Sequence, residues 1–172
     1  MKYIFLSGIH GVGKSTLSKK IQELLDIQTV TVSNLIKQAG KNFDSYNKET
    51  KNISKNQELW KNELNNLDLG KSKLLLDGHF CLLDSERNIV LLPFETFNDT
   101  NMDKIIVMKN RPELIRDRLF ERDQLDYSID FLQKFQDFEI QQSISYSNKY
   151  EIKLFIYDEK QPLSNLLHFI TS

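Results

Sequence analysis

The chain has 172 residues, of which 40% are hydrophobic and 27% charged, a composition typical of one soluble domain with a hydrophobic core. Its net charge of −1 provides no overall positive field, so we expect no binding to bulk nucleic acid or to an anionic membrane surface. Cys81 is the single cysteine, and the sequence has neither a signal peptide nor an apolar run of membrane-spanning length. We therefore expect no internal disulfide, no membrane contact and a cytoplasmic location.

The first predicted elements enclose a glycine-rich motif. Residues 3–8 are predicted to form a strand and residues 14–25 a helix, because the first run is apolar and the second has apolar residues at helical spacing. Between them, residues 8–16 (GIHGVGKST) fit the pattern G-x-x-x-x-G-K-[ST]. A strand, a glycine-rich turn and a helix form the context of a phosphate-binding loop (P-loop). The motif therefore predicts a nucleoside triphosphate site for ATP and Mg²⁺.

Each part of this loop has a predicted role. The glycines let backbone N–H groups turn toward a polyphosphate, and the helix N-terminus stabilises the anion. Lys14 adds a point charge for the β- and γ-phosphates, and the Ser15 hydroxyl can take one position on Mg²⁺. For His10 we predict only a backbone contribution. The residues predicted to bind the nucleotide are Gly8, His10, Gly11, Val12, Gly13, Lys14, Ser15 and Thr16.

The next segment contains a short strand and two helices. Residues 27–32 alternate and are rich in β-branched side chains, which predicts a strand, and residues 33–39 predict a short helix. Residues 41–53 are polar and have no periodicity, so they are predicted to form a mobile loop. A further helix carries Trp60, which we interpret as a core packing residue rather than a base-stacking platform.

Residues 73–79 predict a strand that is buried on both faces and that ends in two polar side chains. Asp77 is poorly suited to a strand, so it requires a partner; beside a P-loop it can hold Mg²⁺ through water, and we predict it as a metal and catalytic residue. His79 has two interpretations that the sequence leaves open. It polarises a water or orients a phosphate as a catalytic residue, or it is a satisfied polar residue at a strand end.

The rest of the chain continues to alternate between strands and helices. Residues 80–103 are predicted to form a long irregular segment, and a loop of this length in a compact domain is usually functional or partly structured. Ser128 is predicted to cap a long helix whose inward residues are Ile129, Leu132, Phe135, Phe138 and Ile144. The other predicted elements are strands at 104–108 and 152–157 and helices at 113–122 and 163–170. This alternation predicts one α/β domain over residues 1–172, a three-layer α/β/α P-loop fold with a five-stranded parallel sheet.

Three arginines follow the fourth predicted strand. Arg118 and Arg122 are four residues apart and therefore share one face of the predicted helix, where two guanidinium groups suit a phosphoryl group in transfer. The alternative is a solvated face that pairs with neighbouring acids. Because the P-loop and Asp77 occur in the same chain, we predict Arg118 and Arg122 as catalytic and Arg116 as solvated.

With these motifs described, the chain resembles the nucleoside-monophosphate kinase branch of P-loop proteins. Residues 8–16 look like the G-x-P-G-x-G-K-[ST]-T loop of adenylate kinases. Residues 74–79 (LLLDGH) are similar to the D-G-F and D-x-H strand ends of bacterial and archaeal adenylate kinases, the latter shared with the eukaryotic adenylate kinases and ribosome-assembly ATPases. Residues 112–122 look like the entry to the family's lid, where Arg118 and Arg122 match its arginine pair.

The resemblance also implies how the acceptor side is organised. Residues 32–37 occupy the place of the helix that cradles the acceptor nucleotide, which makes residues 33–70 an acceptor-side insertion and residues 118–128 a short lid. The chain departs from the family pattern in three ways: Asn34 stands where an acid is usual, no arginine precedes Arg87, and no arginine follows Arg122. Because of these departures, the sequence does not identify the acceptor.

The resulting hypothesis is a kinase that transfers the γ-phosphoryl group of MgATP to a nucleotide-like or other small acceptor. The alternative is an ATP-dependent switch or assembly factor with slow hydrolysis and a protein partner, which the sparse acceptor-side arginines would suit. A 5′-polynucleotide kinase shares the loop, but the net charge and the lack of a basic stripe argue against it.

Overall fold

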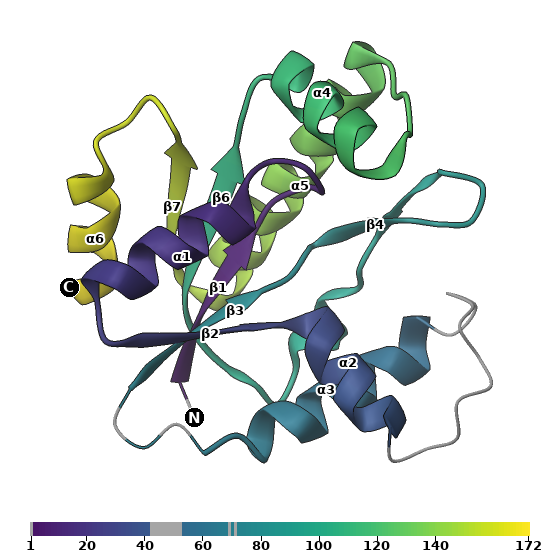
Figure 1. The fold of residues 1–172 in the computed structure, drawn as a ribbon. Helices are drawn as coiled ribbons and strands as arrows, with labels where there is room; N and C mark the ends of the chain where they lie inside the picture. Colours follow the sequence, from purple (N-terminus) through teal and green to yellow (C-terminus); the bar gives the residue numbers. More distant parts are fainter. Residues whose placement is uncertain (1, 42–52, 69, 71) are drawn as a thin grey trace.

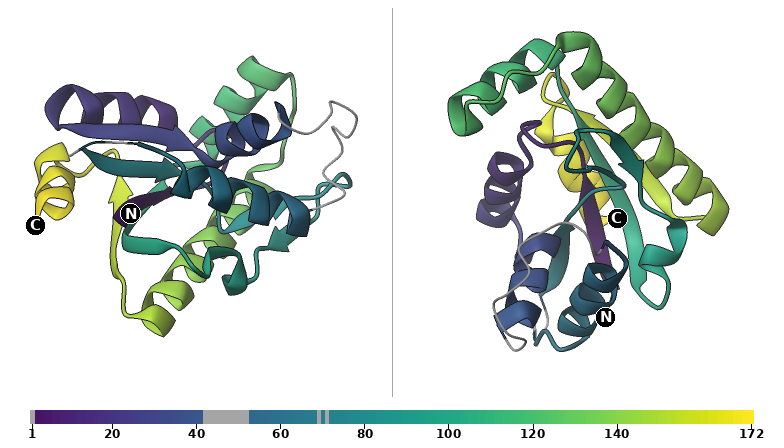
Figure 2. Two further views of the ribbon diagram at one scale, coloured as in Figure 1. Left: turned by 90° about the horizontal axis from the view of Figure 1, so that it is seen from below. Right: turned by 90° about the vertical axis from the view of Figure 1, so that its right-hand side faces the viewer.

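The computed structural model describes residues 2–41, 53–68, 70 and 72–172. Their central element is a five-stranded parallel sheet with helices on both faces, as Figures 1 and 2 show. In spatial order its strands are β2 (Ile27–Thr31), β3 (Lys73–Asp77), β1 (Lys2–Ser7), β6 (Asn101–Lys109) and β7 (Lys153–Asp158). The predicted three-layer P-loop fold is confirmed. The loop predicted for residues 41–53 falls almost entirely on residues 42–52, which lie outside the described part.

Side chains of β1 alternate between two hydrophobic clusters, as the two-residue period of a strand requires. Ile4 and Leu6 belong to the cluster that α1 and α6 cover, whereas Tyr3 and Phe5 belong to the cluster under α2 and α3. Helix α5 lies on the opposite side of the sheet from α1 (Figure 2). The helices are α1 (Lys14–Leu24), α2 (Val32–Lys41), α3 (Ile53–Asn65), α4 (Pro112–Asp123), α5 (Ile129–Tyr150) and α6 (Leu163–Thr171). In the described part, none of these is long and apolar enough to cross a bilayer.

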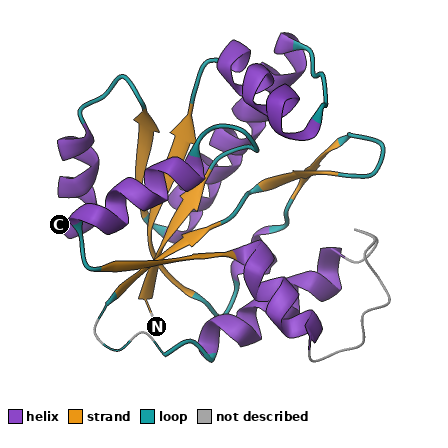
Figure 3. Ribbon diagram, viewed as in Figure 1, coloured by secondary structure: helices purple, strands orange, loops and turns teal. Residues whose placement is uncertain are grey.

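Residues 80–103, predicted to be a long irregular segment with a function or partial structure, are partly structured, and the wholly irregular form is excluded. They contain a two-stranded antiparallel hairpin, β4 (Cys81–Leu83) and β5 (Ile89–Leu91), and a short 3₁₀ helix, η1 (Phe94–Phe97). The hairpin projects from the sheet as a separate pair of strands (Figure 3). Its turn is stabilised by Asp84, whose carboxylate accepts hydrogen bonds from the backbone N–H groups of Glu86 and Asn88.

Helix α5 begins where the sequence predicted, because the Ser128 hydroxyl accepts a hydrogen bond from the Phe131 N–H. Its inward face differs from the prediction at Phe138, which is 37% exposed. The buried stripe instead runs through Leu132, Phe135 and Glu139, at the spacing of three and four residues that places side chains on one helical face. Phe138 was predicted to face inward because it is hydrophobic. The helical phase set by Leu132 and Phe135 instead places Glu139 on the buried face of α5.

The register of the central strands places the candidate site. Strands β1 and β3 run parallel and pair so that Leu6 lies opposite Asp77. Both strands therefore end on the same side of the sheet. The P-loop follows β1 directly, and residues 78–79 follow β3. The P-loop and the polar end of β3 are therefore neighbours outside the carboxyl ends of the strands, where open α/β sheets bind ligands.

Candidate active site

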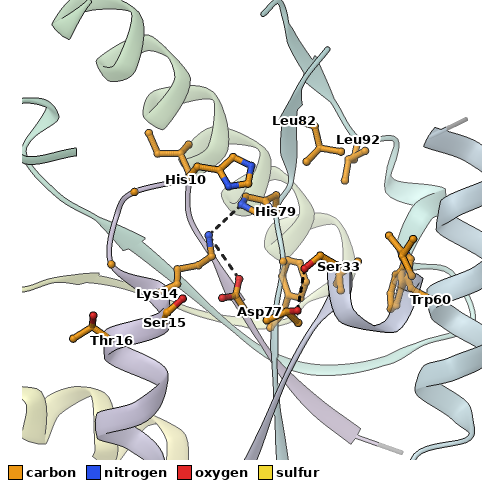
Figure 4. A pocket seen from close by; sticks show the side chains of 18 of the residues that line it. His10, Lys14, Ser15, Thr16, Ser33, Trp60, Asp77, His79, Leu82 and Leu92 are labelled. Atoms are coloured by element: carbon orange, nitrogen blue, oxygen red, sulfur yellow. Dashed lines mark hydrogen bonds and ion pairs between the residues drawn. The ribbon is translucent and has the colours of Figure 1, made fainter. Parts of the chain in front are cut away.

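A cavity of about 530 Å³ opens beyond the carboxyl ends of β1 and β3. Figure 4 shows the P-loop side chains at one end of it and Trp60, Leu82 and Leu92 at the other. Predicted site residues that line the cavity are His10, Gly11, Gly13, Lys14, Ser15, Thr16, Asp77, His79, Arg118 and Arg122. Gly8 and Val12 belong to the loop but lie outside this lining. Val12 is fully buried, and the Gly8 carbonyl accepts a hydrogen bond from Lys14 Nζ.

Gly13 makes the turn from the loop into α1. Its backbone φ is 114°, a left-handed value that side chains other than glycine rarely adopt, and it caps the helix that starts at Lys14. A Cβ at this position would lie 3.0 Å from Nη1 of Arg118. The tight turn therefore brings the N-terminus of α1, with its unpaired N–H groups and positive dipole end, to the cavity.

Lys14 is 7% exposed and lies between the loop and the end of β3. Its Nζ donates to the Gly8 carbonyl, lies 3.1 Å from Nε2 of His79, and pairs with Asp77 Oδ1 at 3.7 Å. Burial lowers the pKa of Lys14, and the carboxylate of Asp77 opposes that change. Burial likewise raises the pKa of Asp77 against the effect of Lys14. A half-buried carboxylate thus faces the amine that is predicted to hold phosphate.

The oxygen donors at this end suit Mg²⁺. Ser15 offers a hydroxyl and Asp77 a carboxylate, and both line the same cavity. Among the described residues no group of three or more His, Cys, Asp or Glu side chains could coordinate a metal. Mg²⁺ is usually held by one or two protein oxygens together with substrate phosphates and water, rather than by an all-protein cage. The residues present therefore fit a metal that arrives with a nucleotide.

Two histidines meet across the cavity. The ring of His10 lies against the ring of His79, with centroids 4.4 Å apart, so its side chain contributes to the site and not only its backbone as predicted. Although His10 is partly exposed, the loss of water around its ring lowers its pKa from 6.5 to about 4, and the charges of Lys14 and Arg122 add to that effect. Burial, Lys14 and His10 also lower the pKa of His79. Both rings are therefore neutral at pH 7.

We expect His10 to make the protein more stable as the pH rises from about 4 to 6.5. In this range the unfolded chain binds a proton at His10 that the folded chain does not, so the free energy of unfolding increases with pH. Urea unfolding at pH 4.5 and 6.5 measures this difference. His10→Asn should reduce it, whereas His168→Asn, which changes an exposed ring, should leave it unchanged. Identical pH dependence in all three proteins would contradict the assignment.

The three arginines of α4 differ in their surroundings. Arg118 Nη1 donates a hydrogen bond to the Val12 carbonyl at 2.9 Å, which connects α4 to the P-loop. Its Nη2 lies 3.5 Å from Glu159 Oε1. Arg122 lines the cavity while pairing with the adjacent Asp123 at 2.5 Å. Arg116 pairs with Asp117 and does not line the cavity. The predicted phase of the helix is therefore confirmed, while the catalytic roles stay predictions.

Glu139 is a buried residue at the site that sequence reasoning missed. Its carboxylate is 0% exposed and accepts hydrogen bonds from the Ser7 hydroxyl and from the N–H groups of Gly8, Phe80 and Cys81. Burial raises its pKa, and these hydrogen bonds and Lys14 oppose the rise. Glu139 thereby joins the start of the P-loop to the chain that follows His79. The available signal was its position on the apolar stripe of α5, seven residues after Leu132.

Comparison with known proteins agrees with this architecture. A family model described as an AAA domain matches residues 7–135. A protein of Methanocaldococcus jannaschii described as a putative adenylate kinase is 26% identical over 125 residues, which are 69% of this chain and 58% of that protein. The chain therefore spans less than two thirds of this curated relative. A gluconokinase from Sinorhizobium meliloti 1021 superposes with a TM-score of 0.50 at 12% identity, covering 97% of this chain and 87% of that one, a likeness of fold alone.

Proposed function

Since this chain belongs to the AAA domain family and is a nucleoside-monophosphate kinase-like P-loop protein, we propose that it transfers the γ-phosphoryl group of MgATP to a small acceptor. The observation that carries the proposal is the single cavity that joins the P-loop to a separate wall formed by α2, α3 and the β4–β5 hairpin. A cavity with a predicted phosphate-binding end and a second, apolar half would have room for a donor and an acceptor side by side. An enzyme that only hydrolyses ATP has no need of that second half.

The proposed catalysis is positioning and charge stabilisation. Lys14 and the backbone N–H groups of the P-loop bind the phosphates, and Asp77 and Ser15 hold the metal. When bound, Mg²⁺ neutralises charge that develops on the phosphate oxygens. Lys14 would exchange its contacts with Gly8 and Asp77 for phosphate oxygens, whose negative charge would offset the cost of burying the amine.

The two lining arginines receive different proposed roles. Arg122 extends from α4 into the cavity and contacts no P-loop carbonyl, so its guanidinium can turn from Asp123 toward the phosphoryl group in transfer. Arg118, which is bonded to the Val12 and Gly11 carbonyls, would orient the loop and the bound nucleotide. The ring of His79, which contacts Lys14, would orient a phosphate or accept a proton.

The relative described as a putative adenylate kinase makes AMP one acceptor to test, and the comparisons do not favour the switch or assembly ATPase. That alternative predicts capture of a protein partner that depends on bound nucleotide. The direct test is a phosphoryl-transfer assay with labelled ATP and Mg²⁺ against nucleosides, nucleotides, sugars and other small alcohols. Label that appears only in inorganic phosphate, whatever the acceptor, would refute the kinase.

We expect Asp77→Asn to lower Mg²⁺-dependent turnover by about a hundredfold while ATP affinity changes less than about threefold. The amide keeps the shape of the side chain and removes the charge that orders the metal and its water. Turnover over a Mg²⁺ titration and ATP binding by calorimetry measure the two effects. Asp103→Asn removes an exposed carboxylate that pairs with Lys2 and should change neither. Equal losses of binding and turnover would make Asp77 a structural residue.

A further inference from the structure

The half of the cavity away from the P-loop is apolar. Its walls come from α2, α3, β4 and the segment around η1 (Figure 4). They consist of Val32, Ile36, Trp60, Leu82, Leu92 and Phe97. Trp60 packs against Phe97 with ring centroids 6.3 Å apart. The polar side-chain groups of the described lining on this side are uncharged: the Thr31 and Ser33 hydroxyls, which lie 3.0 Å from each other, and the indole N–H of Trp60.

All charged residues among the described lining belong to the phosphate end. They are Lys14, Arg118, Arg122 and Asp77, and together they carry two net positive charges. MgATP brings about two negative charges at neutral pH. The two negative charges of MgATP therefore balance the two net positive charges of the described lining.

We infer that the acceptor is an uncharged hydroxyl compound with an apolar or aromatic body, and not a phosphate monoester or a sugar acid. The inference rests on the proposed phosphotransferase function and specifies its substrate class. Burying an apolar or aromatic body against the apolar walls makes the free energy of binding more favourable. The hydroxyls of Thr31 and Ser33 can orient the reacting hydroxyl of the acceptor without adding charge.

An acceptor phosphate would be placed poorly in this half. A monophosphate carries nearly two negative charges, and bringing them beside Ile36, Leu82 and Trp60 removes their water, while the described lining supplies no cation there. Sites that bind phosphate usually provide arginine forks or backbone N–H groups. The cations of the described lining all lie at the end of the cavity that is predicted to bind ATP. A neutral acceptor avoids this desolvation cost.

The transfer balances for a hydroxyl acceptor. The acceptor oxygen forms a bond to the γ-phosphorus, and the bond between that phosphorus and the β–γ bridging oxygen breaks, so that ADP leaves. The hydroxyl proton passes to water. The products are a phosphate monoester, ADP and one proton.

The inference is tested with matched acceptor pairs that differ by one phosphate group. Thymidine and adenosine are compared with their 5′-monophosphates, and an aryl alcohol with its phosphate ester. Binding is measured by calorimetry on protein saturated with Mg²⁺ and a non-hydrolysable ATP analogue, and transfer is measured with labelled ATP. We expect the neutral member of at least one pair to bind about tenfold or more tightly than its charged partner. Equal affinity, preference for the charged member in every pair, or no saturable binding of either member would overturn the inference.

A charge added to the apolar wall provides the second test. Leu82→Arg places a guanidinium on the half-buried face of β4, and we expect the monophosphates to gain about tenfold or more relative to their neutral partners, with unchanged affinity for the MgATP analogue. Leu91→Arg is the matched control on the paired strand, because Leu91 is 44% exposed and does not line the cavity. The same change of preference in both variants would overturn the assignment of the wall.

These measurements separate the inference from the proposed function. Failure of the MgATP analogue to bind at all refutes the phosphotransferase. Saturable analogue binding together with transfer to monophosphates alone leaves the phosphotransferase in place and refutes the uncharged acceptor.

Discussion

Replacing Lys14 with alanine or methionine is expected to lower kcat for phosphoryl transfer by at least about a thousandfold. Lys14 is the cation that the P-loop pattern aims at the transferring phosphates, and its Nζ already lies beside Asp77 and His79 at the centre of the cavity. The charge that it stabilises is spread most widely in the transition state, so its loss acts on turnover more than on the binding of ATP.

The fold should survive this change, which makes the experiment interpretable. A buried amine is costly to desolvate, and Lys14→Met keeps much of its volume while removing that cost. Lys19→Ala, an exposed lysine on the same helix, is the matched control and should keep normal turnover. Single-turnover kinetics with labelled ATP and thermal unfolding measure both properties. Normal kcat in Lys14→Met would refute the P-loop as the reaction centre.

The elements that the sequence predicted well are those with a strong local pattern. The P-loop is defined by nine consecutive residues, and each strand of the main sheet is built around a short apolar or β-branched stretch. Trp60 was placed in the core because a large aromatic on an amphipathic helix gains most by burial, and it is 0% exposed. In each case a local pattern was sufficient.

The β4–β5 hairpin was missed because each strand has only three residues, too few for a periodic signal. The indication was present in the turn, where Asp84 and Asn88 flank a polar segment between two apolar triplets. Residues 33–70 were predicted to form the acceptor side, but the contribution of Leu82, Leu92 and Phe97 to the apolar half of the cavity was missed. The residues of this half come from four separate segments, and only tertiary packing brings Ile36, Trp60 and Leu82 together.

Glu139→Ala is expected to lower the free energy of unfolding by about 3–5 kcal/mol. All of its partners are donors: the Ser7 hydroxyl, Gly8 N at 3.2 Å, Phe80 N at 2.9 Å and Cys81 N at 2.7 Å. Alanine would leave these donors buried without an acceptor, at a cost of about 1–3 kcal/mol for each one that water does not reach.

Glu139→Gln tests whether the two carboxylate oxygens are needed together. Glutamine keeps the shape but has one acceptor oxygen, and its NH₂ group would face either the pair Ser7 and Gly8 or the pair Phe80 and Cys81. We therefore expect a loss of about 2 kcal/mol or more in urea unfolding at pH 7. Asp137→Asn, which alters an exposed acid on the same helix, should stay within about 0.5 kcal/mol of the unaltered protein.

The same carboxylate connects stability to function, because Gly8 begins the P-loop and Phe80 follows His79. If Glu139 fixes the distance between these segments, Glu139→Gln should lower kcat by about tenfold or more under conditions where the variant is still fully folded, with less change in the affinity for MgATP. A variant that is destabilised yet retains full kcat would limit Glu139 to the core. A variant with unchanged unfolding free energy would show that water or a shifted backbone satisfies the four donors, and that the two strand ends do not depend on this acid.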